Sequence, residues 1–549
     1  MKNDEAIKFI IPDYIISILR KLEEAGIEAY LVGGCVRDLL MDNPPAGGVK
    51  DWDIATNAKP EEIVRIFPDS VYENEFGTVG IKIKIDANLR MECESTNSIN
   101  IENKTEIVEV TTFRIESKYS DKRHPDGVKF AKTLKEDLSR RDFTVNAMAL
   151  KISNFQFPIS NKISNYKIID LFDGQEDLKN KIIRAVGDAG ERFNEDALRM
   201  MRAIRFASTL NGIFNFQFST LPTGRQVFKQ ISNSKYQIRN NKLNWKIEEK
   251  TLEAIKKNAK NIEYVSRERI KDELIKIILS DNPSEGIDML HKTGLLDYII
   301  PELKKGVDMA QNRHHIYTIY KHNLLSLKFC PSKKLETRLA ALLHDIAKPQ
   351  TKRGEGEFAT FYNHDHVGAR VARKILERLK FSRNIIDKVF LLVDNHMFYY
   401  NPEEVSESSV RRLIQKVGLE NMKDLLDLRI SDRLGSGVPK AKPYKLRHME
   451  YIIDKVSTDA VSVKMLKING NDLMKDLNIA SGPIIGAIMD VLLSEVIEDA
   501  SKNNRENLLF RAKELMKLDL EKLRQMAKKK IEEKKEEDDE EIKKKHWVR

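Results

Sequence analysis

Apolar residues along the chain follow two different patterns. In residues 1–150, short apolar or alternating runs predict strands, and a helix is predicted over about 12–25. The predicted strands are AYLVGG (29–34), DWDIAT (51–56), TVGIKIKI (78–85) and EIVEVTTFRI (106–115). From about residue 170 onward the apolar spacing is helical almost throughout, as in 268–279 and 338–348. We therefore expect an α+β protein, with an N-terminal α/β domain followed by helical domains.

Several segments interrupt these patterns. The stretches at about 88–105, 153–166 and 211–246 are rich in Asn, Ser, Gln and Lys, and such compositions cannot bury a core. We interpret them as surface insertions. The charge run at 528–545 predicts a solvated helix or a disordered tail, and RNA binding is an alternative role for it.

Composition limits the class of protein. A chain of 549 residues has room for three or four domains, and its net charge of +10 suits a polyanionic partner such as RNA as well as an ordinary basic protein. The three cysteines, Cys35, Cys93 and Cys330, give neither a disulfide framework nor a zinc motif. The first residues form no cleavable apolar signal, and no apolar run approaches the roughly 20 residues that span a bilayer. We expect a cytoplasmic protein without a membrane partner.

The first candidate site begins at Gly33-Gly34, between a predicted strand and a helix that opens at Val36-Arg37-Asp38. Two glycines allow the backbone to approach a phosphate, and a helix N-terminus offers free N–H groups. Arg37 can add a charge-assisted contact to the same phosphate. A structural turn is the alternative for this segment alone.

Two carboxylates, Asp51 and Asp53, follow at a spacing that places both on one face of a strand, with Trp52 behind them. Such neighbours repel each other unless one is protonated or a cation lies between them. A pair of Mg²⁺ ions about 3.5–4 Å apart would neutralise this repulsion and is suited to in-line phosphoryl transfer.

LVGGCVRDLL followed by DWDIAT resembles the motif of class II nucleotidyltransferases, the family of bacterial CCA-adding enzymes and poly(A) polymerases. The resemblance covers roughly residues 10–310. It implies that Gly34 and Arg37 bind the nucleotide and that Asp51 and Asp53 hold catalytic metals. Glu109 is a candidate for a third carboxylate; a plain surface position is its alternative.

Two further segments match the family in order. Arg140-Arg141-Asp142-Phe-Thr-Val-Asn146, by itself a helix N-terminus with solvated arginines, resembles the ribose-recognition motif. The resemblance implies that Arg141 contacts ATP and that Asp142 and Asn146 order the ribose side.

The second segment, 195–205, predicts one amphipathic helix. At about 100° per residue, Glu195, Asp196, Arg199 and Arg202 share a polar sector. Ala197, Leu198, Met201 and Ile204 form the opposite, inward face. Arg205 lies beyond the polar sector, where it would reach a phosphate or RNA. An ordinary helix with salt bridges is the alternative.

This segment resembles the family's base-selecting motif. A carboxylate and an arginine together match the amine and ring acceptor that cytosine and adenine share, while uracil and guanine reverse both positions. Asp196 and Arg199 are thereby expected to select C and A without a template. Residues 113–130, with Arg123, His124 and Asp126, resemble a flexible loop that adjusts this pocket; surface groups are the equal alternative.

A set of histidines and aspartates in the helical region forms another candidate site. Imidazoles and carboxylates from several helices can converge to hold divalent metals. The set resembles the HD phosphohydrolase domain, which implies His322, His344, Asp345 and Asp432 as ligands, completed by His364 and His396. His366 is a rival to His364. The metal, whether Mg²⁺, Mn²⁺ or Ni²⁺, stays open.

The resemblance implies five regions. They are a nucleotidyltransferase head (1–150), a helical neck and RNA-binding body (167–310), an HD domain (311–450), a helical tail (451–520) and a charged tail (521–549). The implied function is template-independent addition of CCA to tRNA from CTP and ATP, with a possible HD phosphatase or phosphodiesterase activity. A poly(A) polymerase, a partial CC- or A-adding enzyme, a silent RNA-binding protein and an HD enzyme with an RNA anchor remain alternatives. The oligomeric state stays open.

Overall fold

The structure is a computed structural model. It describes residues 9–41, 49, 51–72, 77–85, 104–116, 128–152, 162–163, 166–210, 245–311, 316–402, 404–437, 442–458, 466–478 and 481–548. Most of the three expected insertions, together with Cys93, Arg123, His124 and Asp126, lie outside these residues.

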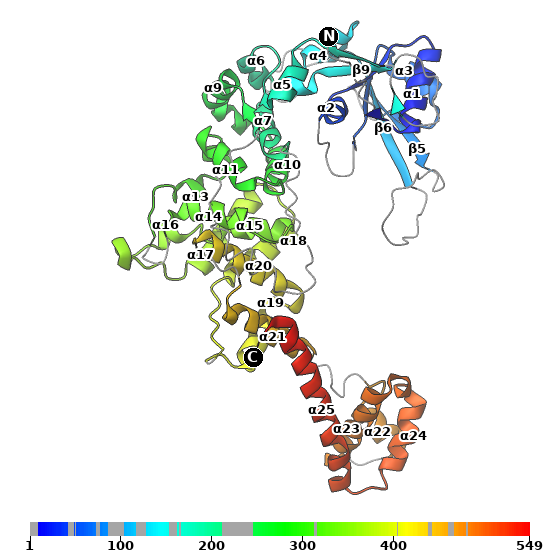
Figure 1. The fold of residues 1–549 in the computed structure, drawn as a ribbon, viewed down its shortest axis with the longest axis vertical. Helices are drawn as coiled ribbons and strands as arrows, with labels where there is room; N and C mark the ends of the chain where they lie inside the picture. Colours follow the sequence, from blue (N-terminus) through cyan, green and yellow to red (C-terminus); the bar gives the residue numbers. More distant parts are fainter. Residues whose placement is uncertain are drawn as a thin grey trace, which may run out of the picture.

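The N-terminal part is built on a mixed sheet of seven strands in the order β11-β9-β2-β3-β6-β5-β4. Only β3 and β6 run parallel within it, and every other neighbouring pair is antiparallel. The strands of this sheet are β2 (Ala29–Val32), β3 (Asp53–Thr56), β4 (Ser70–Tyr72), β5 (Thr78–Ile85), β6 (Lys104–Thr112), β9 (Met148–Ile152) and β11 (Tyr166–Asp170). The α/β head expected from the apolar pattern is therefore confirmed (Figure 1).

Helices cover both faces of this sheet. Ile54, Val108 and Val110 pack with helix α1 and α3 residues in the main core, while Tyr30 and Ala55 pack with α4 residues on the other face. The remaining elements of this part are α1 (Asp13–Glu24), α2 (Gly34–Leu40), α3 (Pro60–Ile66), α4 (Leu134–Ser139), the 3-10 helix η2 (Thr144–Asn146) and the short strands β1 (Phe9–Ile10), β7 (Arg114–Glu116), β8 (Val128–Phe130) and β10 (Lys162–Ile163).

Some predicted boundaries are wrong. The strand expected over 51–56 begins only at Asp53, because its ladders start at Asp53 on β6 and at Ile54 on β2. The strand expected over 106–115 is interrupted at Phe113, whose ring is fully buried, and the chain then pairs with β8. The sheet also continues past residue 150, since β11 completes its edge.

Parts of all three expected surface insertions belong to the fold. In 153–166, Lys162 and Ile163 pair with β1, and Tyr166 pairs with Ile152 of β9. Trp245, near the end of 211–246, is buried, and Lys246 pairs with β12. Residues 104–105 pair with β5 as the start of β6. At these positions the burial of the Trp245 ring and the hydrogen-bonded strand pairing stabilise ordered structure, although the surrounding composition is polar.

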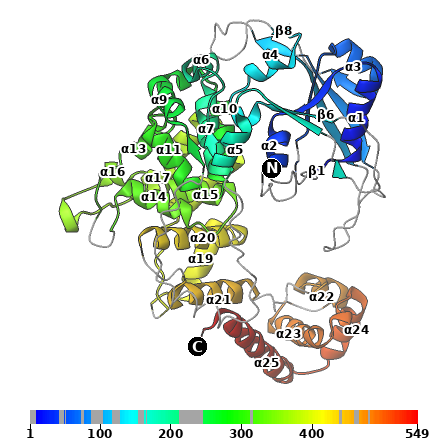
Figure 2. The ribbon, with the colours of Figure 1, turned by 45° about the horizontal axis from the view of Figure 1, so that its top comes forward.

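The middle of the molecule is helical (Figures 1 and 2). The body contains α5 (Gly174–Asn180), β12 (Ile182–Ile183), α6 (Ala189–Glu195), α7 (Leu198–Thr209), β13 (Lys246–Ile247), α9 (Glu249–Asn258), η3 (Ala259–Tyr264), α10 (Arg267–Ile278), α11 (Pro283–Lys292), α12 (Leu296–Ile299) and α13 (Pro301–Lys304). The next bundle contains α14 (Ile319–Lys328), α15 (Leu335–Leu343), α16 (Lys348–Thr351), η4 (Gly356–Phe358), α17 (His364–Arg378), α18 (Arg383–Asp394), α19 (Glu407–Val417), α20 (Leu419–Gly435) and α21 (Tyr444–Thr458).

Body and bundle share one continuous apolar core. Polar contacts also cross between them: Arg338 of α15 donates to the carbonyl oxygens of Ile278 and Ser280 at the end of α10, at 2.8 and 3.0 Å. These carbonyls are among those that a helix C-terminus leaves without a partner in the helix. The two regions are therefore joined through α10 and α15.

The C-terminal unit has its own apolar core. It consists of α22 (Gly470–Leu477), α23 (Pro483–Glu498), η6 (Ala500–Lys502), α24 (Arg505–Leu515) and the long helix α25 (Leu520–His546). Leu523 of α25 belongs to this core, whereas Asp539 and His546 near its end contact α21 through Lys455 and Asp454. The charge run is thus helical, and its end is docked rather than fully solvated. No helix in the described parts of the chain is both long and apolar enough to cross a membrane.

Gly174, at the start of α5, tests how tightly the turn η2 is held. A Cβ at this position would collide with the carbonyl of Thr144 and lie 2.9 Å from Met148. We expect Gly174→Ala to lower the free energy of unfolding by about 1–3 kcal/mol, the cost of overpacking. Urea denaturation would measure this change in the free energy of unfolding. Gly486→Ala is the matched control, because a Cβ at Gly486 meets open space. Gly26→Ala is unsuitable as a control, because the φ of 76° at Gly26 strains any other residue. Equal stability of Gly174→Ala and wild type would contradict the packing described.

Candidate active sites

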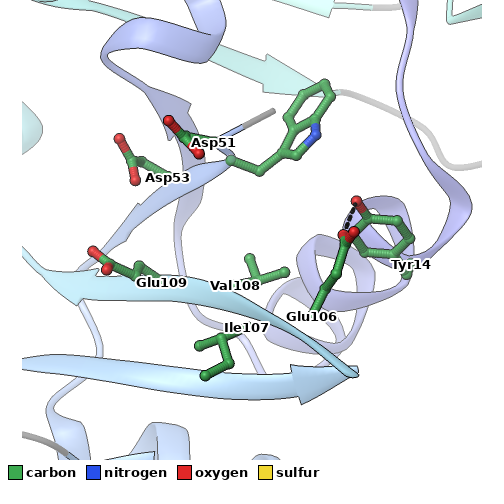
Figure 3. A pocket seen from close by; sticks show the side chains of 8 residues that line it. Tyr14, Asp51, Asp53, Glu106, Ile107, Val108 and Glu109 are labelled. Atoms are coloured by element: carbon green, nitrogen blue, oxygen red, sulfur yellow. Dashed lines mark hydrogen bonds between the residues drawn. The ribbon is translucent and has the colours of Figure 1, made fainter. Parts of the chain in front are cut away.

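Three carboxylates converge at the start of β3. Asp53 lies opposite Glu109 in the parallel ladder, so both side chains leave the same face of the sheet. Figure 3 shows Asp51, Asp53 and Glu109 with their carboxylates directed to the same side. Asp51 precedes the strand instead of lying in it, but the predicted shared face holds. Trp52 is buried, as expected.

The charges of this group are not balanced within the site. Burial raises the pKa of Asp53 to about 6; Arg141 opposes this rise, and the negative charges of Glu109 and Asp51 add to it. Carboxylates in such an arrangement are stabilised by divalent cations, and oxygen donors suit Mg²⁺. The residues present therefore fit a metal site of the type expected, and Glu109 gains a position consistent with a third ligand. A cavity of about 350 Å³ adjoins them, lined also by Tyr14, Glu106, Ile107 and Val108 (Figure 3).

Gly33 forms the turn beside these carboxylates. Its φ is 78°, and a Cβ there would lie 2.8 Å from Arg141 Nη1 and 3.5 Å from Asp53 Oδ2. Only glycine gives this backbone conformation at little cost while leaving room for the guanidinium. Arg141 in turn is held at 3.2 Å by the buried carboxylate of Asp137. The turn, the arginine and the Asp53 carboxylate thus lie together, an arrangement that is suited to phosphate binding.

A buried network connects Arg37 to α7. Arg37 Nη1 donates to Asn146 Oδ1 at 2.8 Å, Asn146 Nδ2 donates to Asp142 Oδ1 at 3.3 Å, and Arg202 Nε donates to Asp142 Oδ2 at 2.8 Å. Burial alone would raise the pKa of Asp142, but Arg202 outweighs it and the pKa falls to about 2. This ion pair stabilises the fold above about pH 4, and its contribution is lost as the pH falls through 2. Four residues expected near the nucleotide are therefore brought together.

The helix expected over 195–205 is two helices. Helix α6 ends at Glu195, Asp196 is extended with φ −139° and ψ 105°, and α7 begins at Leu198. The single-helix prediction is wrong because Asp196 binds elsewhere: its carboxylate accepts from both terminal nitrogens of Arg269, at 2.7 and 3.3 Å, and from the Leu198 N–H. The inward face is confirmed, since Ala197, Leu198, Met201 and Ile204 are all buried.

Arg199 and Arg205 have separate partners. Arg199 donates to Glu195 at 2.7 Å and to the Arg140 carbonyl at 3.2 Å. Arg205 lies 2.7 Å from Glu273 and 3.9 Å from the centre of the Phe206 ring. Both arginines are largely buried. Arg205 is thus directed toward α10. The outward direction that was expected from its angle on the helix, toward a phosphate or RNA, is not seen.

Sequence reasoning missed the residues that hold these groups. Arg269 and Glu273 lie one turn apart on α10, and Asp137 lies on α4. The local sequence around Arg269 and Glu273, RERIKDEL, has the mixed charge of an ordinary solvent-facing helix. Only the burial of Glu273, visible in the folded chain, distinguishes it.

The histidine cluster forms where α14, α15, α17, α18 and α20 meet. Its first half contains His322, His344 and Asp432, and its second half contains Asp345, His364 and His396. Asp345 joins the halves, because its Oδ2 lies 3.1 Å from His322 Nε2 and its Oδ1 lies 3.3 Å from His364 Nε2. Six residues expected as ligands are therefore gathered. His366 is more exposed and bonds to Asp394 at 2.6 Å, so the geometry favours His364.

These groups fit divalent metal. The Nε2 atoms of His364 and His396 are buried and have no hydrogen-bond partner among the described residues. Burial and the positive charge of His344 lower the pKa of His396 to about 3, so its ring is neutral at pH 7 and has a free lone pair. Burial would raise the pKa of Asp345, but His344 and Lys348 hold it well below its usual range. A neutral imidazole and an ionised carboxylate are the forms that bind metal.

Lys348 belongs to this site, although the sequence analysis did not select it. Its Nζ lies 2.6 Å from Asp345 Oδ2 and 2.7 Å from Gln311 Oε1, and the side chain is buried. Its spacing of three residues from Asp345 was the available signal. A buried ammonium beside a metal centre can bind a phosphoryl oxygen.

Three family models match the chain. They are the Poly A polymerase head domain (residues 29–184), the probable RNA and SrmB-binding site of polymerase A (244–306) and the HD domain (314–435). Nucleotidyltransferases and HD proteins generally use divalent metals, in agreement with the two sites. Among solved structures, a CCA-adding enzyme of Bacillus stearothermophilus in complex with CTP has the same fold, with a TM-score of 0.52 and 24% identity over 92% of this chain and 97% of that one.

Curated relatives extend over nearly the whole length. The CCA-adding enzyme of Ligilactobacillus salivarius is 32% identical over 513 residues, covering 92% of this chain and 98% of the relative. That of Enterococcus faecalis is 32% identical over 514 residues, covering 90% and 94%. The family models match residues in the head, the body and the histidine bundle, and these relatives match over about nine tenths of the chain, so the chain belongs to the family of CCA-adding enzymes.

Proposed function

We propose that this chain adds CCA to the 3′ end of tRNA, from CTP and ATP, without a nucleic-acid template. One observation carries the proposal: Asp53, whose carboxylate is directed to the same side as those of Asp51 and Glu109, lies beside the Gly33 turn together with Arg141. A polymerising site needs this combination of metal carboxylates and a phosphate cradle. The two relatives described above, each named a CCA-adding enzyme, support the same activity.

Different residues of the site would hold the metals, the triphosphate and the ribose. Asp51 and Asp53, with Glu109, would hold two Mg²⁺ ions, which lower the pKa of the attacking 3′-hydroxyl and stabilise the leaving pyrophosphate when bound. Gly33, Gly34, Arg37 and Arg141 would bind the triphosphate. Asp142 and Asn146 would order the ribose, with Arg202 fixing Asp142. A cytoplasmic location and the five regions given above remain part of this proposal.

The experiment supplies tRNA lacking its 3′ end with one nucleotide at a time. We expect CTP alone to add two residues, and ATP alone to add one residue only after the two C residues are present. Long A tracts would indicate the poly(A) polymerase alternative, and a stop after CC would indicate a partial enzyme. No incorporation would leave the RNA-binding alternative.

Asp196 and Arg199 are expected to select the base. Asp196→Ala or Arg199→Ala should lower the preference for CTP and ATP over UTP and GTP by about 1–3 kcal/mol, which is the value of one good base contact. Triphosphate binding should change less, because Arg37 and Arg141 are intact. Misincorporation assays measure the first effect and nucleotide titration the second.

The control for this pair is Lys292→Ala, an exposed lysine of α11 that pairs with Asp288. If Arg199→Ala still rejects UTP and GTP as wild type does, then Arg199 has only the structural role seen in its bond to Glu195. Arg269→Ala offers a second comparison, since it releases the Asp196 carboxylate without removing it.

A second function is favoured by the histidine cluster. We propose that it hydrolyses a phosphoester at an RNA end, either a phosphomonoester or a 2′,3′-cyclic phosphate. Two groups of ligands joined by Asp345, with Lys348 beside them, carry this proposal. In the reaction, water supplies the oxygen that joins phosphorus, and the ester oxygen leaves with a proton. A bound divalent metal would polarise the phosphate and activate the water.

A further inference from the structure

Two arginines flank the Asp432 side of the histidine cluster. Arg429 and Arg433 lie four residues apart on α20, so they occupy neighbouring positions on one face of that helix. Asp432 lies between them in sequence, and at about 100° per residue its direction is about 60° from that of Arg429. The arginines thus follow one stripe directly beside a metal ligand.

One carboxylate separates the cluster from this stripe. Asp432 Oδ1 lies 3.5 Å from His322 Nε2, whereas Asp432 Oδ2 accepts a hydrogen bond of 2.8 Å from Arg429 Nη1. The Arg429 side chain is partly exposed, and its guanidinium lies over the Phe398 ring. A ligand that is bound at the cluster and extends past Asp432 would therefore contact the Arg429 guanidinium.

Arg433 has an unusual environment. Within the described ranges, no residue forms a hydrogen bond or an ion pair with it, and its Nε is buried. Arg429, four residues earlier on the same helix, also carries a positive charge, and like charges at this spacing destabilise a helix. An anion between the two guanidinium groups would remove this cost and satisfy the free N–H groups.

The segment after His396 adds an apolar surface. Met397 and Tyr399 are 49% and 68% exposed, and the Met397 sulfur lies 4.0 Å from Arg429 Nη1. Exposed side chains of this kind beside arginines are suited to stack with nucleobases. The combination of the exposed Met397 and Tyr399 side chains with a second cationic position fits a nucleic-acid strand better than an isolated phosphate.

We propose that Arg429 and Arg433 bind the phosphate next to the one that is hydrolysed, so that the cluster takes the end of an oligonucleotide in preference to a mononucleotide. This inference rests on the proposed hydrolase function and names its substrate class. Arg429 and Arg433 are positioning residues: they hold the strand, and the reacting phosphate lies at the histidines and aspartates.

The test compares the dinucleotide CpC bearing a 3′-phosphate with 3′-CMP, each supplied with Mn²⁺. We expect wild type to hydrolyse the dinucleotide with kcat/KM at least about tenfold higher, the effect of a charge-assisted hydrogen bond or two. In Arg433→Gln this ratio should fall toward one, mainly through KM, and Arg433→Lys should restore part of it. Arg383→Gln is the matched control, because Arg383 is an exposed arginine of the same bundle that pairs with Asp387.

Binding gives a readout that does not depend on turnover. The anisotropy of 5′-labelled CpC 3′-phosphate is measured with Mn²⁺, and His344→Ala defines binding elsewhere on the protein. We expect the His344-dependent part to weaken about tenfold in Arg433→Gln. Equal use of both substrates by wild type, an equal loss on both in Arg433→Gln, or unchanged binding in that variant would overturn the inference. If neither substrate is hydrolysed, the proposed hydrolase function fails, and the binding arm still decides the role of the arginines.

Discussion

Asp53→Ala should abolish nucleotide addition, lowering the rate by at least about 10²–10³-fold while tRNA affinity stays nearly unchanged. The reason is that Asp53 lies near the two other carboxylates and near Gly33 and Arg141, where it is placed to hold metal and to face the nucleotide. Single-turnover incorporation of CTP measures the rate, and a filter-binding assay measures tRNA affinity. Incorporation by this variant near the wild-type rate would contradict the assignment of Asp53 as a metal ligand.

Asp53→Asn separates charge from packing. The amide keeps the volume, so the fold should be retained, and relief of repulsion by Asp51 and Glu109 should raise the melting temperature without metal. Mg²⁺ should then stabilise wild type more than this variant, because a ligand that binds only the folded state raises stability by mass action. Equal stabilisation of both proteins by Mg²⁺ would place the metal elsewhere.

His344→Ala should remove hydrolysis at the histidine cluster and leave CTP and ATP incorporation within a few-fold of normal. His344 is completely buried, and its Nε2 lies 3.0 Å from that of His322, so its loss opens the first half of the cluster. Asp53→Ala should have the reverse effect. The measurement is both activities on both variants, with Mg²⁺, Mn²⁺ and Ni²⁺ each supplied.

The control is His344→Gln, which fills more of the space and separates loss of metal from loss of packing. Coupling between the sites has a physical route. His344 directly follows the last residue of α15, Arg338 of α15 binds the end of α10, and α10 also holds Asp196 through Arg269. Loss of nucleotide addition in well-folded His344→Gln would show that this route matters. Full hydrolysis in either His344 variant would contradict the ligand assignment.

Much of the architecture could be predicted from periodicity. The strand over 78–85, the helices near 12–25 and 268–279 and the helical remainder have strong local patterns, and local patterns depend on neighbours in sequence. The metal candidates could also be predicted, because the motif order and the chemistry of carboxylates and imidazoles do not depend on knowing the packing. The structure brings each group together.

The partners that hold these residues could not be predicted. Asp196 leaves the helical path because Arg269, 73 residues away, offers two hydrogen bonds that a helical position would not reach. Glu273 and Lys348 have ordinary local sequences, and their burial arises from helices that pack only in the folded chain. Trp245 shows the same limit, since a polar neighbourhood concealed a core position.

Helix α25 sets both a length and a phase. It spans about 35 Å from Leu523, in the core of the C-terminal unit, to His546, against α21, at 1.5 Å per residue. An insertion of one residue between these points would turn the unit by about 100° about the helix axis, as well as moving it outward. An insertion of seven residues, close to two full turns, would move it about 10 Å with little change of face. The number of residues in α25 therefore determines the distance between the C-terminal unit and α21. The same number determines the orientation of the unit, because each residue turns it by about 100° about the helix axis.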